Sequence, residues 1–119
     1  MGGVFLGVDF HARTQTVSWC GTANGVVERR TLDHRTDDVR AFYQQLSGEV
    51  VVGWEASGYS SWFEQMLEGL GHQAWVGDAT EIRRLARRRQ KNDKRDAEHI
   101  LELLLKDEFP RLHRQSAES

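Results

Sequence analysis

The chain of 119 residues is 39% hydrophobic and 29% charged, which is typical of one folded domain and excludes a disordered or fibrous chain. Its longest apolar runs are far shorter than the ~20 residues that span a bilayer, so no membrane partner is expected. The single cysteine, Cys20, excludes an internal disulfide. Together with the absence of a signal-peptide pattern at the N-terminus, it favours a cytoplasmic location.

The first quarter of the chain has the pattern of three strands. Residues 4–9 are nearly all apolar up to Asp9, as in a strand that is buried on both faces. Residues 14–20 and 25–31 alternate more loosely, and an Asn-Gly turn signal lies between them. We therefore expect an antiparallel meander.

Helices and strands alternate in the rest of the chain. The predicted elements are a helix at 36–46, a strand at 50–54, a helix at 60–70, a strand at 72–76 and helices at about 80–90 and 93–106. Together with the meander they predict an α/β fold, a mixed five-stranded sheet with helices on its faces. This is the layout of ribonuclease-H-like domains, although other α/β folds begin similarly. We expect the domain to cover residues 1–109 and a polar tail to cover 110–119.

The formal net charge of −2 hides an uneven distribution of charge. Eight of the sixteen Lys and Arg residues lie between residues 83 and 95, and Asp93 is the one acid among them. A solvated helix surface would explain such a run, but ordinary helix surfaces mix both signs. The window is therefore expected to bind a nucleic-acid backbone. Its cations are Arg83, Arg84, Arg87, Arg88, Arg89, Lys91, Lys94 and Arg95.

Two carboxylates stand at the ends of apolar strands. Asp9 ends the first strand and Glu55 follows the strand at 50–54. An ionised carboxylate in such surroundings is costly unless it is paired, hydrogen-bonded or metal-bound. Residues two apart in a strand point to the same face, so Gly7 lies on the face of Asp9 and Gly53 on the face of Glu55. Because glycine has no side chain, these positions are expected to leave room for ions or a ligand. Taken singly, each acid could instead serve a turn or a loop.

Two more carboxylates open the last predicted helix. Asp93 and Asp96 are three residues apart and so project from one side of that helix, which continues into Ile100, Leu103 and Leu104. Helix capping explains these two residues alone equally well. Four hard oxygen ligands meeting in one place are, however, what Mg²⁺ or Mn²⁺ requires. Two such ions ~3.5–4 Å apart can assist phosphodiester cleavage.

These segments together resemble the N-terminal domain of the DEDD transposases of the insertion-sequence one-ten family. That family includes the pilin-gene-inverting and the bridge-RNA-guided recombinases. The resemblance covers residues 4 to about 105. The motifs that carry the resemblance are Gly7-Val-Asp9-Phe-His11, Trp54-Glu55-Ala-Ser-Gly58-Tyr59, Leu67-Glu-Gly-Leu-Gly71 and Lys91-Asn-Asp93-Lys-Arg-Asp96-Ala97.

The resemblance implies a RuvC-like fold whose catalytic, metal-binding tetrad falls on Asp9, Glu55, Asp93 and Asp96. It implies Mg²⁺ or Mn²⁺ as cofactor, DNA strand cleavage and exchange as the overall activity, and DNA as a partner, with structured guide RNA as a further partner in some members. Further copies of the chain are also expected as partners. The chain departs from the family at Gly77-Asp78, where an Asn-Pro is usual. It also has no match to the family's C-terminal domain, which bears a serine used in strand cleavage. We therefore expect a fragment, a truncated copy or an excised domain, which is incomplete as an enzyme.

Two other functions compete with the recombinase hypothesis. A non-catalytic module for nucleic-acid binding and dimerisation would share the basic window but would bind equally well in chelator. An actin-like or sugar-kinase half-domain would need a glycine- and hydroxyl-rich phosphate loop soon after Asp9, where Phe10, His11, Ala12 and Arg13 stand instead.

Some conspicuous residues have ordinary explanations. Trp19, Trp54, Trp62 and Trp75 are expected in the core rather than as platforms for base stacking. His99 lies one turn after Asp96 and could face the site, but a surface position is the expectation. His11 has a better chance of facing the site because it follows Asp9 closely. Lys91 is a candidate contact to the scissile phosphate, and the backbone of residues 57–59 could contact nucleic acid or simply begin the following helix.

Overall fold

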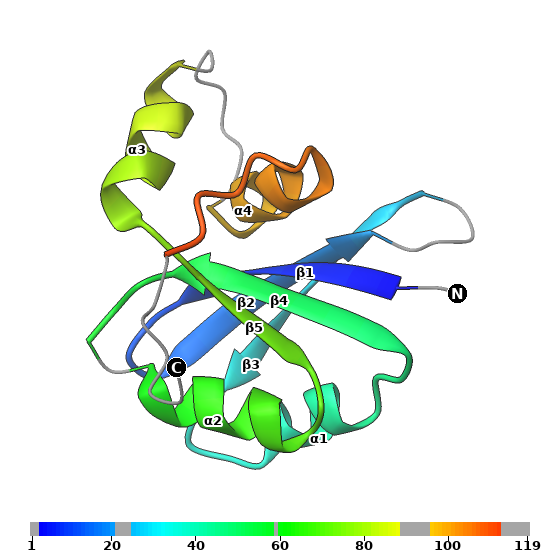
Figure 1. The fold of residues 1–119 in the computed structure, drawn as a ribbon. Helices are drawn as coiled ribbons and strands as arrows, with labels where there is room; N and C mark the ends of the chain where they lie inside the picture. Colours follow the sequence, from blue (N-terminus) through cyan, green and yellow to red (C-terminus); the bar gives the residue numbers. More distant parts are fainter. Residues whose placement is uncertain (1–2, 21–24, 59, 89–95, 113–119) are drawn as a thin grey trace, which may run out of the picture.

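The computed structural model describes residues 3–20, 25–58, 60–88 and 96–112 (Figure 1). Its elements are β1 (Gly3–Phe10), β2 (Thr14–Cys20), β3 (Val27–Asp33), α1 (Asp38–Gln44), β4 (Glu49–Glu55), α2 (Ser61–Gly69), β5 (Gln73–Gly77), α3 (Ala79–Arg88) and α4 (Asp96–Leu105). The predicted order of strands and helices is therefore confirmed. Within this described part, no helix is long and apolar enough to cross a membrane.

The five strands form one mixed sheet in the order β3-β2-β1-β4-β5. Strands β1, β2 and β3 pair antiparallel, which confirms the predicted meander. Strands β4 and β5 add to the other side of β1 in parallel. Parallel neighbours need a crossover connection, and here α2 makes it between β4 and β5. This is the ribonuclease-H-like arrangement predicted from the order of elements.

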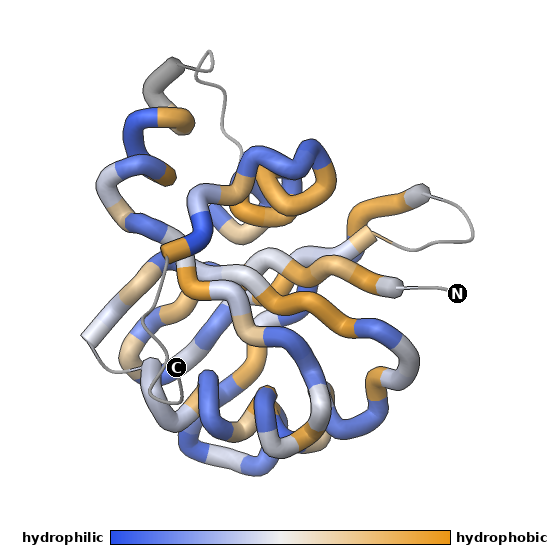
Figure 2. The backbone as a smooth tube through the Cα atoms, in the orientation of Figure 1, coloured by the Kyte–Doolittle hydropathy of each residue, from blue (hydrophilic) through white to orange (hydrophobic). Residues whose placement is uncertain are grey.

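Helices cover both faces of the sheet (Figure 1). Helices α1 and α2 lie on one face, where Val8, Val52, Trp54 and Phe63 belong to the larger hydrophobic core. Helix α4 lies on the other face, where its residues pack with alternate residues of the same central strands in a smaller core. The middle parts of β1 and β4 are apolar, as expected for strands that are covered on both faces (Figure 2).

Helix α4 packs directly on the backbone of β1. A Cβ atom added to Gly7 would lie 2.4 Å from the amide nitrogen of Leu101 and 2.5 Å from the carbonyl oxygen of Ala97. A Cβ atom on Gly53 would lie 3.1 Å from Cδ1 of Leu104. The expectation that these glycines leave room for ions or a ligand is therefore wrong. Instead, they allow the helix to approach the sheet closely.

The chain after α4 returns to the edge of the sheet. The amide of Asp78 donates to the carbonyl of Pro110 at 2.9 Å, and the amide of Leu112 donates to the carbonyl of Val76 at 2.7 Å. Gly77 and Arg111 form an isolated antiparallel bridge. Pro110 and Leu112 of the expected polar tail are thus hydrogen-bonded to the end of β5 and to the residue that follows it. Residues 113–119 lie outside the described part of the chain.

The tryptophans are not all core residues. Trp54 is fully buried, and Trp19 and Trp75 are half-buried against the two cores. Trp62 remains 42% exposed, although its ring also contacts Phe10 and Phe63. The prediction of core positions is therefore wrong for Trp62, because α2 is amphipathic and this residue lies beside its apolar stripe.

Candidate functional site

The strand register brings the first two predicted acids to the same end of the sheet. Strands β1 and β4 pair in parallel as far as Val8 and Trp54, and Asp9 and Glu55 are the next residue of each strand. Alternation along a strand points both side chains to the face that α4 covers. Their side chains are 28% and 39% exposed, so they lie at the rim of the core, where water can reach them.

One cavity of about 480 Å³ brings three of the four predicted acids together. Asp9 and Glu55 contribute from the sheet, and Asp96 contributes from the first turn of α4. Asp93 lies outside the described residues. The remaining lining comes from the strand ends and the facing sides of α3 and α4: Val8, Phe10, Ala56, Ser57, Ile82, Arg83, Ala86, His99 and Ile100.

The cavity has the oxygen chemistry of a site for a hard divalent cation, but its described residues are not preassembled into one. Carboxylates are the ligands that Mg²⁺ and Mn²⁺ take in proteins. Among the described residues, no three Asp, Glu, His or Cys side chains gather closely enough to hold a metal ion. The hydroxyl of Ser57 is buried in the cavity wall and finds no hydrogen-bond partner within the described part, which leaves one polar group available to a ligand.

The two strand-end acids each have a basic partner. Nε2 of His11 lies 3.0 Å from Oδ2 of Asp9. From α3, Nη1 of Arg83 lies 3.1 Å from Oε2 of Glu55. His11 was expected to have some chance of facing the site, and it does contact Asp9. Both pairs are partly exposed, so each stabilises the fold only weakly.

Two cations of the predicted phosphate-binding window, Arg83 and Arg84, have described side chains. Arg89, Lys91, Lys94 and Arg95 lie outside the described residues, as do the side chains of Arg87 and Arg88. The two arginines that are described both have acidic partners: Arg83 contacts Glu55, and Arg84 contacts Glu81 one turn earlier on its own helix.

His99 is a site residue, and the expectation of a surface position is wrong. It is only 8% exposed rather than at the surface, it lines the cavity, and its Nε2 lies 3.4 Å from the carbonyl oxygen of Ile82. The signal was present in the spacing: His99 precedes Ile100 on the stripe of α4 that faces the sheet. It therefore connects α4 to α3 across the cavity.

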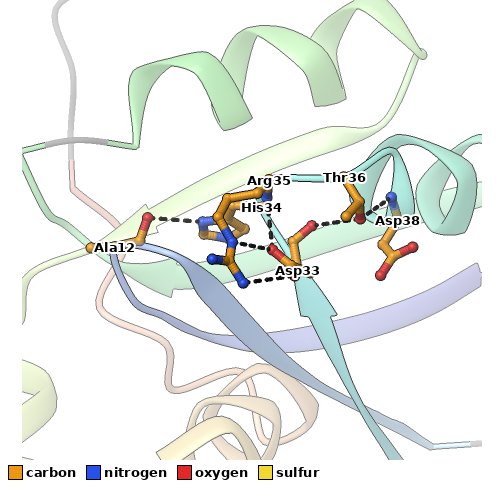
Figure 3. Close-up of polar contacts among 6 residues, drawn as sticks. All are labelled: Ala12, Asp33, His34, Arg35, Thr36 and Asp38. Carbon is orange, nitrogen blue, oxygen red and sulfur yellow. Dashed lines mark hydrogen bonds and ion pairs between the residues drawn. The ribbon is translucent and has the colours of Figure 1, made fainter.

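A partly buried hydrogen-bond network supports the turn that follows Asp9. Nδ1 of His34 lies 3.3 Å from the carbonyl oxygen of Ala12, and its Nε2 lies 3.1 Å from Nε2 of Gln15. Tyr43 donates to Oε1 of Gln15 at 2.7 Å, which leaves the Gln15 amide as donor to His34. His34 must then be neutral, with its proton on Nδ1. The loop around it is held by Asp33, which accepts three hydrogen bonds from Arg35 (Figure 3).

The free energy of unfolding of the domain is expected to decrease as the pH decreases, because of His34. Burial lowers the pKa of His34 below 6.5, more than the Ala12 carbonyl and the charge of Asp33 raise it. As pH falls through 6.5, the unfolded chain takes up a proton at His34 that the folded chain resists, so the free energy of unfolding decreases. Asp33 adds to this loss of stability only when the pH falls through 3.8 and below, because the Arg35 hydrogen bonds lower its pKa from 3.8.

This expectation can be measured by urea unfolding at pH 7.5 and pH 5.5. His34→Gln should lose less stability than the wild type between the two values, because its side chain does not titrate. Equal losses in the two proteins would contradict the role of His34.

Comparison with known proteins gives one family match. A model of the DEDD transposases of the insertion-sequence one-ten type, described as "Transposase", matches residues 6–119. No curated protein matches the chain. Among solved structures, the chain is similar to the Fowlpox virus resolvase in its crystal structure with substrate Holliday junction DNA. The identity is 10% and the TM-score 0.44, over 87% of this chain and 74% of that chain. Since the family match covers nearly all of its residues, the chain belongs to the DEDD transposase family of the insertion-sequence one-ten type.

Proposed function

We propose that the chain is the metal-binding, RuvC-like domain of a transposase or site-specific DNA recombinase that acts in DNA strand cleavage and exchange. The observation that carries this proposal is the shared cavity of Asp9, Glu55 and Asp96. These acids come from three separate elements and line one cavity that is open to water. Such a gathering is unexpected if each acid only served its own turn or helix end. Membership of the transposase family supports the same conclusion.

In this proposal the residues of the chain have distinct roles. Asp9, Glu55 and Asp96, with Asp93 three residues before Asp96 in the sequence, would hold Mg²⁺ or Mn²⁺. Bound ions of this kind activate an attacking oxygen and stabilise a leaving one in phosphodiester chemistry. The basic residues between 83 and 95 would hold the phosphates of the strand that enters the cavity.

The partners follow from the same assignment. DNA is the expected substrate, and copies of the chain are expected to assemble as dimers or larger oligomers. Structured guide RNA is a partner only if this chain resembles the RNA-guided members of the family. Binding of metal and of DNA is the measurement that tests these assignments directly.

Thermal unfolding with and without divalent metal tests the proposal. At a Mn²⁺ or Mg²⁺ concentration about 100 times its Kd, binding should stabilise the domain by about 2.7 kcal/mol, a rise of roughly 10 °C in Tm. Asp9→Asn should abolish the rise because it removes a charged oxygen ligand. Asp37→Asn is the matched control, since Asp37 is exposed at the start of α1 on the opposite face of the sheet and makes no capping hydrogen bond. A wild-type Tm that is the same in metal and in chelator would refute metal binding.

The second candidate is a non-catalytic module for nucleic-acid binding and dimerisation with the same fold. The pairing of Asp9 with His11 and of Glu55 with Arg83 favours it, because both acids already have partners without a metal. This module would bind DNA equally well in chelator and in Mn²⁺, whereas the metal-binding domain should bind more tightly in Mn²⁺.

A further inference from the structure

Arg83 is the one described cation from the basic window that reaches the cavity. It extends from α3 to the end of β4, and its guanidinium contacts Glu55 at 3.1 Å. Both residues line the cavity that also contains Asp9 and Asp96. The Arg83 side chain is 61% exposed, so the guanidinium lies at the cavity mouth with water on its other side.

We propose that Arg83 is a positioning residue that holds the Glu55 carboxylate in the metal-free domain and is released to a DNA phosphate once Glu55 binds a divalent cation. This inference rests on the proposed function, since it assigns Glu55 to the metal. It gives the guanidinium two successive anionic partners, the carboxylate and then the phosphate.

The electrostatics of the cavity supply the reason for the first partner. Three carboxylates that line one cavity repel one another when no cation is present. The guanidinium of Arg83 offsets part of that repulsion and holds the Glu55 side chain toward the cavity. A partly exposed ion pair of this kind changes an affinity by only about two- to fivefold, so a divalent cation can displace it.

The chemistry of arginine supplies the reason for the second partner. A guanidinium does not lose its charge, and its planar set of donors suits the oxygens of a phosphate as well as those of a carboxylate. Once freed from Glu55, it remains at the mouth of the cavity, where a bound strand would pass. DNA binding and metal binding would therefore favour each other, because each relieves the competition for Arg83.

Arg84 provides a matched control on the same helix. It is also partly exposed, but it pairs with Glu81 of α3 and does not line the cavity. Glutamine at position 83 or 84 removes the same charge from adjacent positions, so any difference between the two variants reports the contact with Glu55.

The first measurement is the affinity for Mn²⁺ without DNA, by calorimetry on the full chain. Arg83→Gln should tighten Mn²⁺ binding about two- to fivefold relative to the wild type, because the competing guanidinium is gone. Arg84→Gln should bind Mn²⁺ as the wild type does. An equal change of Mn²⁺ affinity in both variants would mean that only the net charge matters. An unchanged affinity in Arg83→Gln would mean that Arg83 does not compete with the metal for Glu55. Either result overturns the inference.

The second measurement is the salt dependence of binding to a double-stranded DNA. In Mn²⁺, Arg83→Gln should lower the slope of log Kd against log salt by about 0.9, the loss of one phosphate contact. In chelator its slope should equal that of the wild type, since Glu55 then holds the guanidinium. An equal loss of slope in both conditions would show that Arg83 binds phosphate regardless of metal and would overturn the inference. If the wild-type chain binds no Mn²⁺ at all, the proposed function itself fails, which the calorimetry shows separately.

Discussion

Replacing Gly7 with alanine is expected to lower the free energy of unfolding by roughly 1–3 kcal/mol or more. The added methyl group would lie 2.4 Å from the Leu101 nitrogen and 2.5 Å from the Ala97 oxygen, which are backbone atoms of α4 and cannot rotate away. The helix must therefore move off β1 to relieve the clash. Because Asp96 directly precedes Ala97, this movement should also reduce the metal-induced rise in Tm.

Gly69→Ala is the control for this substitution. Gly69 ends α2, and an added Cβ there would meet nothing within 4 Å. Alanine in a helix is favoured over glycine by about 0.5–1 kcal/mol, so urea unfolding should show an unchanged or slightly higher stability. Gly7→Ala with wild-type stability and a wild-type response to metal would show that the close approach of α4 to β1 does not position Asp96.

Replacing Phe63 with alanine is expected to have the largest effect, a loss of about 3–5 kcal/mol. Phe63 is fully buried at the centre of the larger core. Its ring centroid lies 4.8 Å from that of Trp54, 5.3 Å from that of Tyr43 and 5.4 Å from that of Phe10. Alanine would leave a cavity among rigid aromatic rings that cannot collapse into it, and the loss is a large part of the 5–15 kcal/mol that stabilises a typical domain.

Two variants make this measurement interpretable. Trp62→Ala removes a larger ring from the neighbouring position of α2, but Trp62 is 42% exposed, so its loss of stability should be smaller. Phe63→Leu keeps most of the apolar volume and should retain a folded protein if the alanine variant does not fold. The midpoint of urea unfolding measures all three, and an equal loss for Trp62→Ala and Phe63→Ala would contradict the assignment of Phe63 to the centre of the core.

The strand elements and two of the predicted acids could be read from local pattern. An apolar run that ends in one acid predicted both β1 with Asp9 and β4 with Glu55, and the structure has strands that end at or just beyond these residues. The reason is that a central strand must be apolar on both faces, and this leaves a strong signal in a short stretch of sequence. The pairing of the two strands follows from the order of elements, because parallel neighbours joined by a crossover place their carboxyl ends together.

The surroundings of these acids depended on elements far away in the chain. The missing side chain of Gly7 was expected to leave room for ions or a ligand. Helix α4, about ninety residues later in the chain, occupies that room. His99 was expected at the surface, but it is buried and its ring lies near the Ile82 carbonyl of α3. The basic window predicted cations for phosphate, and the structure shows that Arg83 and Arg84 have acidic partners.

The sequence by itself determined the order of the strands and helices, the mixed sheet and the family, because these depend on periodicity and on short motifs. Only the tertiary structure decided which side chains share the cavity and which partner each charge has. A helix can cross a sheet at many positions with the same apolar pattern, and the contact of backbone with backbone at Gly7 selects one of them. The first turn of the same helix carries Asp96, which lines one cavity with Asp9 and Glu55.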